Sequence, residues 1–235
     1  MPEFVLYYIQ SVMNFTASNK LITDALRYMR VPSNVHDEEL INTVKNAFEK
    51  LETFIQPRCV WGRFPIVHFD GGIELAGAYI YSEDIERLTS RSNDCIVIAA
   101  TLGLEVDRQI TISLQTNMLD GLALDACASV RIDAFIDQFM KSEIAPGLSE
   151  GEFMTSRFSP GYGDLKLSVI EDIITILNAV KRIGLSVRPN SLRTFSFTCA
   201  ETQKLSVPFS ITRTGFVQPY CLSVFLEVLL TAQTS

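Results

Sequence analysis

The chain has 235 residues, of which 47% are hydrophobic and 20% charged, so it can bury a substantial core and is too apolar for intrinsic disorder. Its formal net charge is −7 and its Lys and Arg residues do not cluster, which argues against a nucleic-acid partner, because phosphate binding needs clustered cations. No apolar run approaches the ~20 residues that span a bilayer, and the opening residues lack the basic leader of a signal peptide, so we expect a cytoplasmic protein that is not bound to a membrane.

The five cysteines predict reduced, mostly buried thiols in place of a zinc site or a disulfide framework. They are odd in number, widely spaced, and include no Cys-x-x-Cys pair. They are Cys59, Cys95, Cys127, Cys199 and Cys221. His68 has only His36 as a second histidine and no matching ligand pattern, so we interpret it as a hydrogen-bonded strand residue. We therefore expect no metal site.

Residues 1–56 predict an N-terminal helical region. Its first helix is marked by apolar residues at helical spacing: Leu21, Ile22, Ala25, Leu26 and Met29. Residues 37–55 predict a second helix, which has acidic residues in its first turn and is followed by Pro57. The whole of the first forty residues is thus interpreted as helical.

Residues 57–185 predict an α+β core that begins with strands. Residues 58–69 are rich in aromatic and β-branched side chains, and Asp70-Gly71-Gly72 separates them from more strand-like sequence over residues 73–80. The continuous apolar run over residues 94–103 is typical of a central strand that is covered on both faces.

Helices separate and follow these strands. Ser82 should cap a short helix, and two further helices are predicted over Glu105–Gln115 and residues 118–144. The longer of the two could pack closely against a neighbouring helix, or form the floor of a ligand groove, because it carries several small residues. These are Gly121, Ala123, Ala126, Ala128 and Ser129.

The last predicted helix of the core covers residues 166–184. Asp164 or Ser168 should cap its beginning, and Gly184 suits the left-handed residue just past its end.

From Ser186 the composition changes, and residues 186–235 form a divergent C-terminal segment rich in Ser and Thr. Residues 194–216 could form a pair of strands, and residues 222–232 an apolar terminal segment. The order of elements predicts an α+β fold, with a mixed or antiparallel central sheet flanked by helices, and one compact domain overall.

The segment "RFSPGYGDL", residues 157–165, predicts a stiff bend that carries functional side chains which a simple turn does not need. Pro160 fixes its own φ and makes Ser159 extended, and Gly161 can take a positive φ or let a ligand approach the backbone. We expect exposed amides there, a planar guanidinium fork from Arg157, and a π face and hydroxyl from Tyr162. An amino-acid-like or nucleoside-like ligand would fit. The alternative is a purely structural corner with Arg157 in a surface salt bridge.

This segment, with the amphipathic helix ending in "RIGL", resembles the activation domain of cobalamin-dependent methionine synthase, and more closely its free-standing relatives. Upstream segments resemble the free-standing proteins too: "DEELINTVKNAFEKLE", "PRCVWGRFPI", "CIVIAATLGLEVDRQI" and "MLDGLALDACASVRIDAFIDQF". The resemblance covers roughly residues 20–185 and implies an activation-domain-like fold.

The resemblance implies that the chain binds S-adenosylmethionine (AdoMet) in a shallow groove. The methyl group would go to a cobalamin that has oxidised to cob(II)alamin, with an electron from a flavodoxin-type partner. Arg157 would hold the AdoMet carboxylate, and the backbone at Ser159 would meet the adenine side, with Pro160 and Gly161 also among the ligand-binding residues. Tyr162, the catalytic candidate, would lie near the cobalamin. By charge, Asp125 or Asp133 could face the ammonium or sulfonium.

In such a reaction the protein mainly positions the reactants, because the reduced cobalt is itself the nucleophile and the sulfonium carries its own leaving group. Residues 186–235 depart from the family pattern: its Thr-Glu-Ser segment is absent, and Tyr220 has no paired tyrosine. The homocysteine, folate and cobalamin modules are also absent. The resemblance therefore implies action in trans, on a corrinoid-binding protein or a cobalamin-dependent methyltransferase. The alternative is a non-catalytic module that docks on such a protein and has lost ligand binding.

Overall fold

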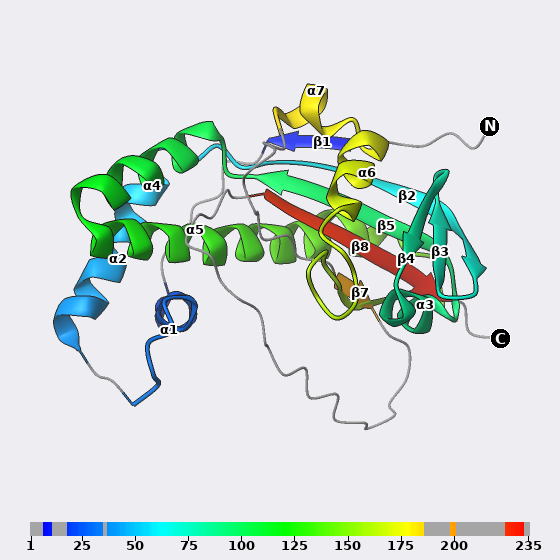
Figure 1. The fold of residues 1–235 in the computed structure, drawn as a ribbon, viewed down its shortest axis with the longest axis horizontal. Helices are drawn as coiled ribbons and strands as arrows, with labels where there is room; N and C mark the ends of the chain where they lie inside the picture. The colour runs from blue at the N-terminus through cyan, green and yellow to red at the C-terminus, as the bar shows by residue number, and fades with distance from the viewer. Residues whose placement is uncertain (1–6, 11–17, 35–36, 186–197, 201–223, 233–235) are drawn as a thin grey trace.

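The computed structural model describes residues 7–10, 18–34, 37–185, 198–200 and 224–232 (Figure 1). The helices are α1 (Asn19–Tyr28), α2 (Glu38–Glu52), α3 (Glu83–Thr89), α4 (Leu104–Thr116), α5 (Met118–Phe139), α6 (Val169–Ile176) and α7 (Ala179–Ile183), with a π-helical turn (Met140–Ile144) and a 3-10 turn (Ala145–Gly147) after α5. The strands are β1 (Tyr7–Gln10), β2 (Arg58–Phe69), β3 (Gly72–Leu75), β4 (Ala78–Tyr81), β5 (Ser92–Thr101), β6 (Phe153–Arg157), β7 (Thr198–Ala200) and β8 (Val224–Ala232). The predicted α+β class is confirmed.

Within the described residues, eight strands form one sheet in the order β4-β3-β2-β5-β8-β6-β7, with β1 added beside β2. The strand pairs are antiparallel. The long strand β2 pairs with β1 and β5 along its first part and with β3 at its end. Strand β5 lies between β2 and β8, which confirms the predicted central strand.

Helices cover both faces of β5, and the alternation of its side chains divides the core in two. Ile96 and Ile98 point into a cluster formed with α1, α2, α4 and α5. Cys95, Val97 and Ala99 point into the opposite cluster, which contains the apolar faces of α6 and α7. All five side chains are almost fully buried. Helices lie on both sides of the sheet at β5 (Figure 1). Successive strand residues face opposite sides of a sheet, so the part of a strand that is covered on both sides must be apolar at every position.

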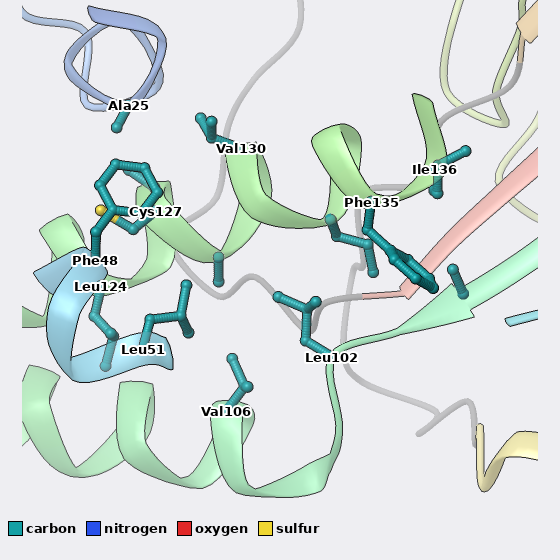
Figure 2. Close-up of a cluster of buried hydrophobic side chains, with 14 of the residues drawn as sticks. Ala25, Phe48, Leu51, Leu102, Val106, Leu124, Cys127, Val130, Phe135 and Ile136 are labelled. Atoms are coloured by element: carbon teal, nitrogen blue, oxygen red, sulfur yellow. The ribbon is translucent and has the colours of Figure 1, made fainter. Parts of the chain in front are cut away.

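Helix α5 is the centre of the first cluster (Figure 2). Phe48 of α2 packs there beside Cys127 and Leu124 of α5, with Ala25 of α1 close by. At Gly121, an added Cβ would lie 2.6 Å from the backbone nitrogen of Leu114 in α4. The prediction that small residues let this helix pack closely is confirmed at that position, where no side chain fits.

Three expectations about strands and helices were wrong in detail, one because of a tertiary contact and two because of a local change in backbone conformation. Residues 7–10, predicted as helix, form β1 and pair with Arg58–Trp61 of β2, whose edge is open there. Residues 73–80 form the two short strands β3 and β4, because Ala76 and Gly77 adopt φ of 49° and 87° in a two-residue hairpin turn.

The predicted helix over residues 166–184 is two helices. Asn178, at φ 50°, separates α6 from α7, and Gly184, at φ 72°, ends α7 in the left-handed conformation as predicted. Ser168 occupies the N-cap of α6 without a side-chain hydrogen bond. Asp164 does not cap this helix either, because its carboxylate binds the beginning of α3.

In the C-terminal segment, β7 lies within the predicted pair of strands, and the rest of residues 194–216 lies outside the described residues. Residues 224–232, interpreted only as an apolar terminal segment, form β8 between β5 and β6. The divergent segment therefore contributes a strand to the middle of the sheet.

Arg63 of β2 connects the sheet to the segment before β6. Its Nη2 donates to Asp94 Oδ2 at 2.8 Å and to Glu152 Oε1 at 2.7 Å. The Arg63 hydrogen bond, together with the Ser149 amide, lowers the pKa of Glu152, and the Glu152 carboxylate raises the pKa of Arg63. The ionised carboxylate of Glu152 therefore stabilises the folded state.

We expect the Glu152→Gln variant to be less stable than wild type at neutral pH, by about 0.2–1 kcal/mol for this partly exposed pair. Because the folded-state pKa of Glu152 is lowered, its contribution is complete above the ordinary value of 4.5 and is lost as pH falls through the lowered pKa. The variant should therefore lose less stability than wild type on acidification, as measured by urea unfolding. Glu150→Gln, at an exposed neighbour, is the control; an equal effect in both variants would contradict the assignment.

Candidate functional site

The corner, residues 157–165, is a hydrogen-bonded bend whose amides are largely used internally. Gly161 N donates to Leu165 O at 2.8 Å, and Tyr162 N donates to Ser159 O at 3.0 Å. Gly161 takes the positive φ that was expected, 93°. The expectation of exposed amides is wrong for Gly161 and Tyr162, because the bend closes on itself. What the corner can offer a ligand must come from its side chains.

Arg157, the last residue of β6, lies against two carboxylates of α5. Its Nη2 is 2.9 Å from Asp137 Oδ1, and its Nη1 is 3.6 Å from Asp133 Oδ1. Asp133 and Asp137 are four residues apart, so both project from one face of the helix. The hydroxyl of Tyr28 in α1 donates to the other oxygen of Asp133 at 2.8 Å. Asp133 therefore connects α1, α5 and the end of β6.

These side chains line a cavity of about 510 Å³ between α1, α5 and the end of β6. Its walls are strongly charged, with the cations Lys20, Arg27, Lys141 and Arg157 and the carboxylates Asp24, Asp133 and Asp137. The Arg157 side chain is 23% exposed, so its guanidinium is accessible from the cavity while held in place. A guanidinium fork beside carboxylates offers partners for both charges of a zwitterionic amino-acid group.

The other predicted site residues do not line this cavity. Ser159 and Pro160 are buried, Gly161 is exposed, and the half-buried Tyr162 ring lies 6.5 Å from the Phe158 ring. Phe158 packs on the core at the opposite face of the sheet from α5. The chain thus directs Arg157 toward α5 and then turns to the other side.

Asp125 and Asp133 were open alternatives for the cation partner, and the structure distinguishes their positions. Asp133 lies beside Arg157, whereas Asp125 is two turns, or about 12 Å, earlier on the same face of α5 and outside the cavity lining. Asp137 and Tyr28 were not among the site residues predicted from the sequence. The four-residue spacing from Asp133 was the available signal for Asp137; nothing local pointed to Tyr28, which comes from another helix.

Other candidate chemistry has a structural explanation. His68 Nε2 lies 2.9 Å from Thr89 Oγ1, as expected for a hydrogen-bonded strand histidine. Cys59, Cys95 and Cys127 are buried free thiols, and burial raises the pKa of Cys95 and of Cys127 well above the ordinary value, which makes these two thiols unreactive. The described residues contain no group of three potential metal ligands and no helix that is long and apolar enough to cross a membrane.

No protein-family profile and no curated protein matches the sequence. Among solved structures, the chain is similar to the crystal structure of the MetH reactivation domain bound to AdoHcy, with a TM-score of 0.53 and 16% sequence identity. The similarity covers 80% of this chain and 74% of that chain. The chain therefore has the fold of that domain, which confirms the fold that the sequence resemblance predicted.

Proposed function

We propose that this protein binds AdoMet in the cavity between α1 and α5 and supports reductive methylation of a corrinoid carried by a partner protein. The observation that carries the proposal is the placement of the Arg157 guanidinium in a cavity of about 510 Å³ together with Asp133 and Asp137. The fold supports it, because the similar domain was crystallised with AdoHcy, which shares the amino-acid and nucleoside groups of AdoMet.

The charges in the cavity suit the amino-acid end of AdoMet. In the proposal, a ligand carboxylate would displace Asp133, whose contact with Arg157 is long at 3.6 Å, while Asp137 keeps its contact at 2.9 Å. Asp133 and Asp24, both in the lining, then face the ligand's ammonium and sulfonium cations. Tyr28 holds the Asp133 carboxylate in place through its hydroxyl.

The remaining corner residues have separate roles in the proposal. Ser159, Pro160 and Gly161 do not line the cavity, so the adenine would have to extend beyond it to meet this part of the corner, and Tyr162 would contact the corrinoid. Because Tyr162 lies outside the cavity lining, it is assigned to the partner and not to the amino-acid group. The partner would be a cytoplasmic corrinoid-binding protein or cobalamin-dependent methyltransferase, with a flavodoxin-type electron donor. The chain itself would bind and orient AdoMet.

Calorimetry of the whole chain with AdoMet and with AdoHcy tests the proposal. We expect saturable binding of both, and tighter binding of AdoMet, because AdoHcy lacks the sulfonium charge that the carboxylates of the cavity would favour. Absence of heat with both ligands, under conditions where the protein is folded, would rule the proposal out.

The second candidate function is a non-catalytic module that docks on a corrinoid protein. The observation that favours it is the engagement of Arg157 by Asp137 and Asp133 within the chain itself, which a purely structural salt bridge also explains. This candidate predicts binding to a corrinoid protein, measured by sedimentation, without any binding of AdoMet or AdoHcy.

A further inference from the structure

The corner is attached to the beginning of α3, eighty residues earlier in the chain, through Asp164. Its Oδ2 accepts a hydrogen bond from Glu83 N at 2.6 Å, and its Oδ1 lies 3.4 Å from Asp84 N. The same carboxylate accepts the hydroxyl of Ser82, which in turn accepts the Ile85 amide at 3.1 Å. Asp164 thus satisfies amides that the helix cannot pair internally.

The contact is reciprocal and close. Asp164 N donates to Asp84 Oδ2 at 3.4 Å, so backbone and side chain of the corner both meet α3. At Gly163, with φ 51°, an added Cβ would lie 2.0 Å from that same Asp84 oxygen. The corner can approach α3 this closely because Gly163 has no side chain.

The bend is bonded internally and ends in the apolar core. Leu165 is 2% exposed and lies in the same buried cluster as Ile85 of α3. Leu165 also accepts the Gly161 amide within the bend. The short segment from Ser159 to Leu165 is therefore held by its own hydrogen bonds, by the buried cluster around Leu165, and by the hydrogen bonds of Asp164 to α3.

We propose that Asp164 is a positioning residue: by capping α3 it fixes the bend that follows Arg157 and sets the direction in which Tyr162 leaves it. Asp164 does not line the charged cavity, so any effect on a ligand must act through the bend. The part of the proposal that concerns a ligand rests on the proposed binding of AdoMet.

The test compares Asp164→Ala with Asp37→Ala in the whole chain. Asp37 is a matched control, because it caps α2 through Glu39 N at 3.0 Å and Leu40 N at 3.1 Å, far from the corner in sequence. Amide hydrogen exchange is measured by mass spectrometry over residues 159–165. We expect Asp164→Ala to exchange there about fivefold faster than wild type, as the loss of a cap permits, and Asp37→Ala to exchange at the wild-type rate.

AdoMet affinity is the second measurement. We expect Asp164→Ala to weaken binding roughly fivefold and Asp37→Ala to leave it unchanged. Asp164→Asn, which keeps one carbonyl oxygen as an acceptor, should lie between wild type and Asp164→Ala in both measurements, and it serves if the alanine variant does not fold.

Equal exchange of the corner in Asp164→Ala and Asp37→Ala would overturn the proposal, since the effect would then be one of general stability. Faster exchange with unchanged AdoMet affinity would overturn the link to the ligand. If wild type does not bind AdoMet, the proposed function fails, while the exchange comparison still decides whether Asp164 positions the bend.

Discussion

The Arg157→Ala variant is expected to bind AdoMet roughly ten- to 150-fold more weakly than wild type, because a hydrogen bond to a charged group contributes about 1.5–3 kcal/mol. The substitution removes the guanidinium that would hold the ligand carboxylate and leaves Asp133 and Asp137 to repel it. Calorimetry measures the change. Asp137 is half-exposed, so its uncompensated charge is solvated and the fold should persist, as checked by circular dichroism.

Two variants distinguish specific binding of the ligand carboxylate by the Arg157 guanidinium from general electrostatic attraction of the ligand to the cavity. Arg27→Ala removes another cation of the same cavity, one whose side chain is 68% exposed and paired with Asp24, and should leave the affinity nearly unchanged. Arg157→Lys keeps the charge but not the planar fork and should lose most of the affinity. Equal losses from Arg27→Ala and Arg157→Ala would mean that the cavity attracts the ligand only by its overall charge.

The Phe48→Ala variant is expected to lose about 3–5 kcal/mol of unfolding free energy, the cost of deleting a buried phenyl ring from a well-packed core. Phe48 is 1% exposed and belongs to the cluster that joins α1, α2, α4, α5 and the central strand (Figure 2). Chemical denaturation measures the loss. Glu49→Ala, at the exposed neighbouring position on α2, is the control and should change stability little.

The same experiment tests whether residues 1–56 unfold with the core. Ile22 and Phe48 share a buried cluster with Ile96 of the sheet, so we expect one cooperative transition, shifted as a whole in Phe48→Ala. A variant that loses only helical signal in a separate early transition would show instead that the N-terminal helices form an independent unit.

Local physical rules were sufficient for much of the fold. The apolar run of β5 predicted burial on both faces, because a strand has only two faces and both were apolar. Ser82 predicted its own helix start, since a cap acts within three residues. The corner was recognised because Pro160 restricts the backbone by itself and Gly161 permits a positive φ.

The prediction of the site was partial for a related reason. Arg157 and Asp133 were both proposed from the sequence, yet their contact, and the separation of Tyr162 from their cavity, depend on how β6 meets α5. From the sequence alone, Asp137 cannot be distinguished from an ordinary solvent-facing acidic residue on a helix. Only the neighbouring strand makes it a partner of Arg157.

By itself the sequence determined most of the helices and strands between residues 18 and 185, where most of them turn, and which residue types gather in the corner, because these depend mainly on neighbours along the chain. Tertiary structure alone decided that Tyr28 meets Asp133, that residues 224–232 lie in the middle of the sheet, and that Asp164 caps a helix eighty residues away. Each of those contacts joins groups distant in sequence, and a hydrogen bond or a strand pair forms with whichever partner the packed core brings within reach.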